Sequence, residues 1–67
     1  MSISNSNFHV VYDGTRWAVA IEGEGRVRVG VTYARALAIA TSLATLRGAL
    51  LYIHNEDGTV AQRVSFC

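Results

Sequence analysis

The stretch Thr32 to Gly48, TYARALAIATSLATLRG, predicts the single helix of this chain, and the other elements are placed around it. Thr32 favours a helix N-cap, because its hydroxyl can accept a hydrogen bond from a backbone N–H of the first turn. Gly48 suits the position just past the helix, because glycine adopts a left-handed conformation without strain. Between them lie adequate helix formers and neither Gly nor Pro. We therefore expect the helix to begin after Thr32 and to end before Gly48.

The apolar face of this helix is broader than one core requires. At about 100° per residue the apolar arc covers roughly 180°, against the ~100° stripe of a typical surface helix. The residues on this arc are Tyr33, Ala36, Leu37, Ile39, Ala40, Leu43, Ala44 and Leu46. Two interpretations stay open: the face is a thorough cover for a small sheet, or Ile39 and Leu46, seven residues apart and so on one line, contact a second chain.

Five strands are predicted around the helix, at 8–12, 16–22, 26–31, 49–54 and 59–66. Alternating apolar and polar residues indicate strands, and Asp-Gly and Gly-x-Gly steps between them indicate turns. In the third strand the alternation places Val27 and Val29 inward, with Arg26 and Arg28 outward. The order is β-β-β-α-β-β, and the short connections favour hairpins. We expect an α+β fold, with an antiparallel sheet of four to five strands and the helix packed on one face.

A single helix leaves the other face of the sheet uncovered. This face is either solvated or a contact surface in which small apolar residues are ringed by arginine. The residues expected on it, besides one phase of the fourth strand, are His9, Val11, Arg16, Ala18, Ala20, Arg26, Arg28 and Arg63.

Composition sets limits on the class of protein. The chain has 67 residues, which we divide into a disordered Ser/Asn-rich tail at 1–7 and one domain at 8–67. Hydrophobic residues make up 51% and charged residues only 16%, against about 25% charged in an average domain. This excess of apolar side chain predicts self-association. The net charge of +1 gives no strong attraction to nucleic acid or membranes.

All six basic residues are arginine. Arginine can bind phosphate or carboxylate with two parallel hydrogen bonds, but codon bias in a GC-rich genome gives the same composition. The N-terminal residues do not have the pattern of a signal peptide, and no apolar run approaches the ~20 residues of a membrane span. We expect a cytoplasmic protein that does not enter a membrane.

The sequence carries no motif for catalysis, a cofactor or a metal ion. The single cysteine, Cys67, excludes an internal disulfide, and two histidines with one terminal cysteine do not have metal-ligand spacing. His9 and His54 could lie on neighbouring strands, but nothing in their spacing requires it. We interpret them as structural, and we expect the protein not to be an enzyme and to bind no cofactor or metal.

Four short motifs resemble a known family. They are HVV at 9–11, WAV at 17–19, a Thr-led helix with alanines at 36, 40 and 44, and IHNEDG at 53–58. In this order and spacing they resemble the small bacterial domain of unknown function numbered 2188. The resemblance covers most of the chain and implies a compact α+β fold with no established activity. The chain departs from the family pattern at Ala20, where a cation is usual, at Arg35, where Glu is usual, and in a helix that carries little charge.

The first hypothesis for function is a protein-interaction module that forms a homodimer and binds another, unidentified protein. It depends on the broad apolar helix and the low charge. The contact residues that we expect are Ile39, Leu43, Leu46 and Arg35. One version of this hypothesis, suggested only by small size and low cysteine content, is an inhibitor of a host defence system such as CRISPR, encoded by a phage or another mobile element.

The second hypothesis is nucleic-acid binding through the uncovered sheet face. The contact residues would be Arg16, Arg26, Arg28 and Arg63. RNA-binding sheets place exposed aromatic residues between such cations. Here the aromatics of the second and last strands have the phase of the core, and the net charge is close to neutral, so the sequence favours the first hypothesis.

Overall fold

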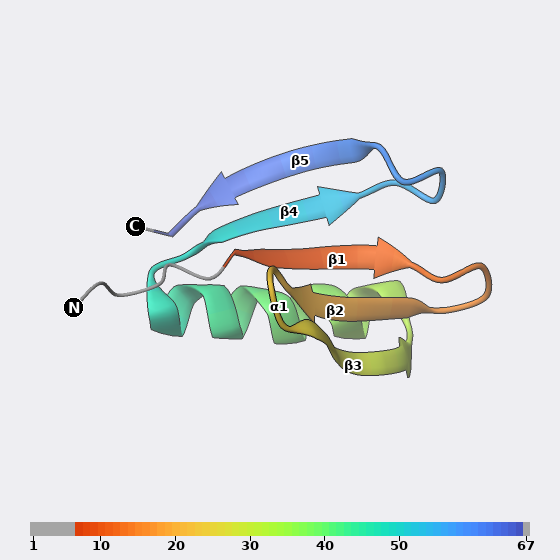
Figure 1. Ribbon diagram of the computed structural model, residues 1–67, viewed down its shortest axis with the longest axis horizontal. Coiled ribbons are helices and arrows are strands. Elements are labelled where there is room, and N and C mark those ends of the chain that lie inside the picture. Colours follow the sequence, from red (N-terminus) through yellow and green to blue (C-terminus); the bar gives the residue numbers. More distant parts are fainter. Residues whose placement is uncertain (1–6, 67) are drawn as a thin grey trace.

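The computed structural model describes residues 7–66 and forms one mixed five-stranded sheet with a single helix on one face (Figure 1). The elements are β1 (Phe8–Tyr12), β2 (Trp17–Ile21), β3 (Gly25–Val31), α1 (Tyr33–Arg47), β4 (Leu50–His54) and β5 (Val60–Ser65). This confirms the predicted α+β fold and the predicted order of elements. Of the predicted tail, residues 1–6 lie outside the described residues, as does Cys67. Asn7 accepts a backbone hydrogen bond from Glu22 at 2.8 Å.

The strands lie in the order β3-β2-β1-β4-β5, and the central strand β1 pairs in parallel with its neighbour β4. The three other pairs are antiparallel, as expected from the short turns. The parallel pair follows from the helix, whose 15 residues span about 22 Å. It carries the chain back along the sheet, so β4 starts at the same end as β1. The sheet is therefore mixed and not antiparallel throughout.

Both predicted ends of the helix are confirmed. Thr32 Oγ1 accepts a hydrogen bond from the backbone N–H of Arg35 at 3.2 Å. Gly48 has the left-handed conformation, with φ at +63°, and its N–H donates to the carbonyl groups of Ala44 and Thr45. Each end thus gives hydrogen-bond partners to some of the backbone groups that a helix end leaves without them.

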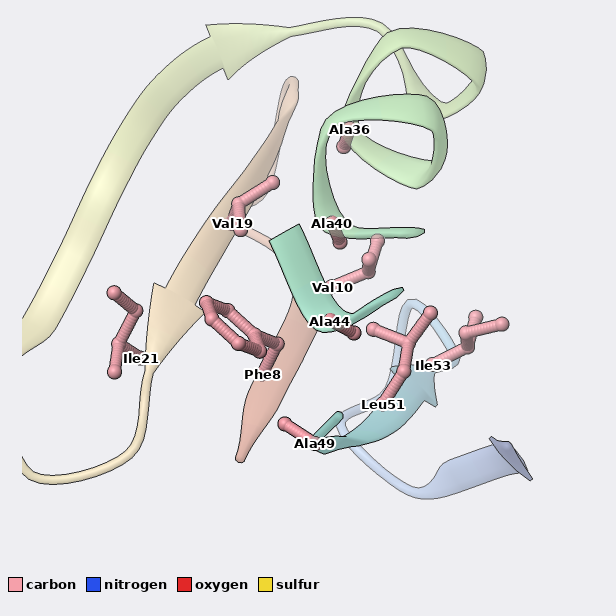
Figure 2. Close-up of a cluster of buried hydrophobic side chains, with 10 residues drawn as sticks. All are labelled: Phe8, Val10, Val19, Ile21, Ala36, Ala40, Ala44, Ala49, Leu51 and Ile53. Atoms are coloured by element: carbon pink, nitrogen blue, oxygen red, sulfur yellow. The ribbon is translucent and has the colours of Figure 1, made fainter. Parts of the chain in front are cut away.

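Alanine forms the contact between the helix and the sheet. Ala36, Ala40 and Ala44 are fully buried, and Figure 2 shows them in the same cluster as the larger side chains of the sheet. The largest fully buried side chains, Phe8, Val10, Val19 and Leu51, come from β1, β2 and β4. Because alanine is short, the helix lies close to these three strands, and its larger aliphatic residues are left at its sides.

The two outer strands are mostly exposed, because a helix about 10 Å wide covers only two or three strands spaced about 4.8 Å apart. In β3, Val27 and Val29 are 43% and 60% exposed, so these two valines are not buried in the core as the alternation predicted. The pairing of β2 with β3 shifts register twice, between Trp17 and Val19 and between Val19 and Ala20. Each extra residue reverses the inward and outward alternation, which a regular period of two cannot anticipate.

Candidate functional site

A groove lies between β3 and the side of α1 that faces it. One part of the groove has a volume of about 420 Å³ and is lined by Val27, Arg28, Ala38, Ile39, Ser42 and Leu43. A neighbouring part shares three of these residues and is completed by Thr32, Ala34 and Arg35. The groove exists because β3 contributes no residue to the buried cluster of Figure 2, while Ile39 and Leu43 pack only partly against that cluster.

Three of the four helix residues that we expected to contact a partner line the groove. Ile39 and Leu43 form its apolar wall, and Arg35 lies at the end nearer the start of the helix. Leu46 follows on the same side of the helix but does not line the groove, and it is 80% exposed. The structure therefore gives Ile39 and Leu43 partial contact with the chain's own core and leaves Leu46 with very little.

The groove is built from a part of the sequence that has no acidic residue. Residues 25–55 contain four arginines and neither Asp nor Glu. Two of these arginines, Arg28 and Arg35, line the groove beside its aliphatic wall. Within residues 7–66 no arginine is paired with a carboxylate, so the chain itself does not neutralise the guanidinium groups of the groove. The groove thus combines apolar surface with positive charge.

The predicted set of sheet-face arginines is split by the structure. Arg26 lies opposite Ala20 and Arg63 lies opposite Tyr52, so both are on the uncovered face. Arg28 lies opposite the buried Val19 and lines the helix-side groove, so its predicted place on the uncovered face is wrong. The register shift between Val19 and Ala20 causes this change of face. Arg16 is exposed at the end of the turn before β2.

One row of side chains crosses the uncovered face through all five strands. Arg26 lies opposite Ala20, which lies opposite His9; His9 lies opposite Tyr52, which lies opposite Arg63. The rings of His9 and Tyr52 stack with centroids 5.0 Å apart and planes 13° apart. Tyr52 is an aromatic residue on this face that the sequence-based hypothesis did not include. The fourth strand is apolar on both of its faces, which hid the phase of Tyr52.

Ala18 was expected on the uncovered face of the sheet, but its side chain is fully buried. Its methyl group is shorter than the side chains around it, including that of Val11 directly opposite on β1. A short side chain on an uncovered face can therefore be shielded without any element packed over it.

The two histidines are joined in a hydrogen-bonded series on the uncovered face. His9 Nδ1 lies 2.9 Å from His54 Nε2, and the ring centroids are 5.2 Å apart. His54 Nδ1 lies 3.1 Å from the carbonyl oxygen of Gly58, and His9 Nε2 lies 3.2 Å from Oε1 of Glu22. Asn7 Nδ2 donates to the same Glu22 oxygen at 3.1 Å. The parallel pairing of β1 with β4 brings these two distant histidines together.

The hydrogen bonds to Glu22 stabilise its ionised form. The Asn7 amide contributes most and the His9 ring contributes next, and together they lower the pKa of the Glu22 carboxyl below its usual value. At neutral pH this side chain is therefore a carboxylate that accepts from both neighbours. No group of three or more His, Cys, Asp or Glu side chains that could hold a metal ion occurs among residues 7–66.

The fold and these surfaces define a small α+β domain with one helix and an arginine-containing apolar groove. By sequence, residues 8–66 match the family model described as an uncharacterized protein conserved in bacteria (DUF2188). The chain belongs to this family, as its motifs suggested. No curated protein and no solved structure matches the chain. Within residues 7–66 no helix has the length and the apolar character that crossing a membrane requires.

Proposed function

We propose that this chain is a protein-binding module whose groove between β3 and α1 holds a segment of another protein that carries both apolar and acidic side chains. One observation supports the proposal most strongly. Val27, Ile39 and Leu43 expose aliphatic surface next to Arg28 and Arg35, in a part of the sequence that has no acid of its own.

The positive charge of the groove favours an occupant that carries acidic side chains. Arginine is suited to carboxylates, because its planar guanidinium can form two parallel hydrogen bonds with them. A second copy docked groove to groove would bring two grooves that each carry Arg28 and Arg35 together, and like charges in an interface are unfavourable. An acidic segment of a different protein does not bring like charges together. The proposal needs no catalytic step.

The proposal is tested by selecting short random peptides, displayed on phage, against the intact chain. We expect enriched peptides to combine acidic with aliphatic residues and to bind more weakly as salt is raised. The double variant Arg28→Gln and Arg35→Gln should reduce their affinity at least about tenfold. A hydrogen bond to a charged group contributes about 1.5–3 kcal/mol, and about 1.4 kcal/mol corresponds to tenfold.

Matched variants separate the groove from the rest of the surface. Arg16→Gln with Arg63→Gln removes the same charge away from the groove, and Val60→Thr on β5 is the control for Val27→Thr on β3. Both valines are exposed, so neither exchange should disturb the core. Peptides that are insensitive to the groove variants, or that lose affinity only with the control variants, would contradict the proposal.

Nucleic-acid binding is the second candidate, and the row across the uncovered face favours it. Arg26 and Arg63 stand at opposite edges of this row, with His9 and Tyr52 between them. The stacking of the two rings on each other leaves fewer ring faces for bases, which makes this candidate weaker. If the chain binds nucleic acid, mixed RNA or DNA should be retarded in a gel, and the retardation should weaken as salt is raised. The double variant Arg26→Gln and Arg63→Gln should abolish this retardation. No retardation at low salt would remove this candidate.

A further inference from the structure

The outer nitrogens of the His9–His54 pair must both carry hydrogen. His54 Nδ1 faces the carbonyl oxygen of Gly58 at 3.1 Å, and a carbonyl oxygen can only accept. His9 Nε2 faces Oε1 of Glu22 at 3.2 Å, and an ionised carboxylate can likewise only accept. Each of these bonds therefore requires an N–H on the ring, which fixes one proton on each histidine.

The inner nitrogens then face each other as lone pairs. In a neutral imidazole only one nitrogen carries hydrogen. With the outer nitrogens protonated, His9 Nδ1 and His54 Nε2 are both acceptors, yet they lie 2.9 Å apart. Two acceptors at that distance repel each other unless a positively charged species lies between them. That species is either a proton, which makes the pair singly charged, or a metal ion.

The surroundings of the pair are those of metal-binding histidines. A histidine that binds a metal through one nitrogen commonly donates its other N–H to a carboxylate or a backbone carbonyl, which fixes the orientation of the ring and raises its basicity. Glu22 does this for His9, and Gly58 does it for His54. His9 keeps 23% of its side chain exposed, so water can complete a coordination sphere from the uncovered side of the sheet.

The separation of the two nitrogens, which is also that of an N–H···N hydrogen bond, is compatible with one geometry of metal coordination. At metal–nitrogen distances of about 2.0–2.1 Å, two ligands at 90° lie roughly 2.9 Å apart, whereas tetrahedral ligands lie roughly 3.3–3.4 Å apart. The observed 2.9 Å matches the first value. Square-planar or tetragonal coordination by nitrogen and oxygen is typical of Cu²⁺ and Ni²⁺, and Cu²⁺ binds most strongly in the divalent series.

We propose that His9 Nδ1 and His54 Nε2 form a two-histidine site for Cu²⁺ or a metal ion of similar geometry, with water in the remaining positions. The metal ion takes the place of the single proton that otherwise lies between the rings, and that proton is released to solvent. This site is on the uncovered sheet face and does not depend on the groove or on the proposed protein partner.

The test is a titration of the tag-free chain with Cu²⁺, followed by electron paramagnetic resonance. All samples carry Cys67→Ser, so that the thiol cannot bind or reduce the metal. We expect one Cu²⁺ per chain with a tetragonal spectrum that shows two nitrogen ligands. His9→Gln and His54→Gln, each checked for folding by circular dichroism, should each remove one nitrogen and weaken binding at least about tenfold.

Glu22 provides a second measurement that is independent of the histidine variants. Glu22→Ala should keep two nitrogen ligands but bind Cu²⁺ about tenfold more weakly, because the His9 ring loses its carboxylate. Glu24→Ala removes an exposed acid of the same turn and should leave the affinity unchanged. Binding that is absent, or that persists after both histidines are replaced, would overturn the proposal and leave the pair with a shared proton alone.

Discussion

At the scale of the residue, short acidic side chains hold the turns through their own backbone. Asp57 Oδ1 accepts from the N–H of Thr59 at 3.0 Å and from its hydroxyl at 2.7 Å. The hydroxyl contributes most to lowering the pKa of Asp57, and the backbone N–H contributes next. Asp13 has the same role in the first turn, where the backbone N–H groups of Arg16 and Thr15 lower its pKa. Both aspartates were predicted at turns, and in these two cases the residue type was sufficient to predict the turn.

The lowered pKa of Asp57 makes its contribution to stability dependent on pH. Because the pKa is lower in the folded chain than in the unfolded one, the contribution is present above the unfolded value and is lost as pH falls through the folded value. Asp57→Asn keeps an acceptor oxygen but removes the charge, so we expect a smaller loss of stability between about pH 5 and pH 2. Urea unfolding over this range measures it, with Glu56→Gln as the control. An unchanged acid dependence would contradict the expectation.

At the scale of the element, the ends of α1 could be predicted from the sequence, but the register of β3 could not. The caps of α1 depend on neighbouring residues, so Thr32 and Gly48 were sufficient to place its ends. The side of the sheet on which Val27 and Arg28 lie depends on register shifts between β3 and β2. An alternating sequence does not predict such shifts. The contact between His9 and His54 depends on the parallel pairing of β1 with β4. Hairpin signals describe sequential strands, so they could not establish it.

Gly30 provides a test of the irregular β3. Its φ of +70° lies in the left-handed region, and no atom lies within 4 Å of the position that a Cβ would occupy. Gly30→Ala should therefore lower the free energy of unfolding by about 1–2 kcal/mol, through backbone strain and not through a clash. Gly30→Asn should cost less, because asparagine tolerates this conformation. Urea unfolding compares the two, and equal losses would contradict the backbone explanation.

At the scale of the whole molecule, the apolar composition predicts self-association, and Leu46 is the residue best placed for it. This side chain is 80% exposed and lies outside the groove with its arginines. We expect sedimentation equilibrium to show dimers at micromolar concentration. Leu46→Ser should weaken them at least about tenfold, since burying such a side chain contributes roughly 1.5–3 kcal/mol.

The control for Leu46→Ser is Val60→Thr, which changes an exposed aliphatic residue on β5. Because Leu46 is so exposed, its replacement should leave the unfolding midpoint of the monomer nearly unchanged. A chain that sediments as a monomer at every concentration would show that its apolar surface serves other partners only. The groove proposal would remain open in that case, because it does not require a second copy.

The alanine contact beneath the helix separates two kinds of constraint on this sequence. Ala36, Ala40 and Ala44 meet the sheet, while Ile39, Leu43 and Leu46 lie to one side of them. Natural variants could therefore exchange the large residues, and with them the preferred partner, while the three small ones preserve the architecture. Members of one such lineage could diverge in what they recognise without having to evolve a new scaffold.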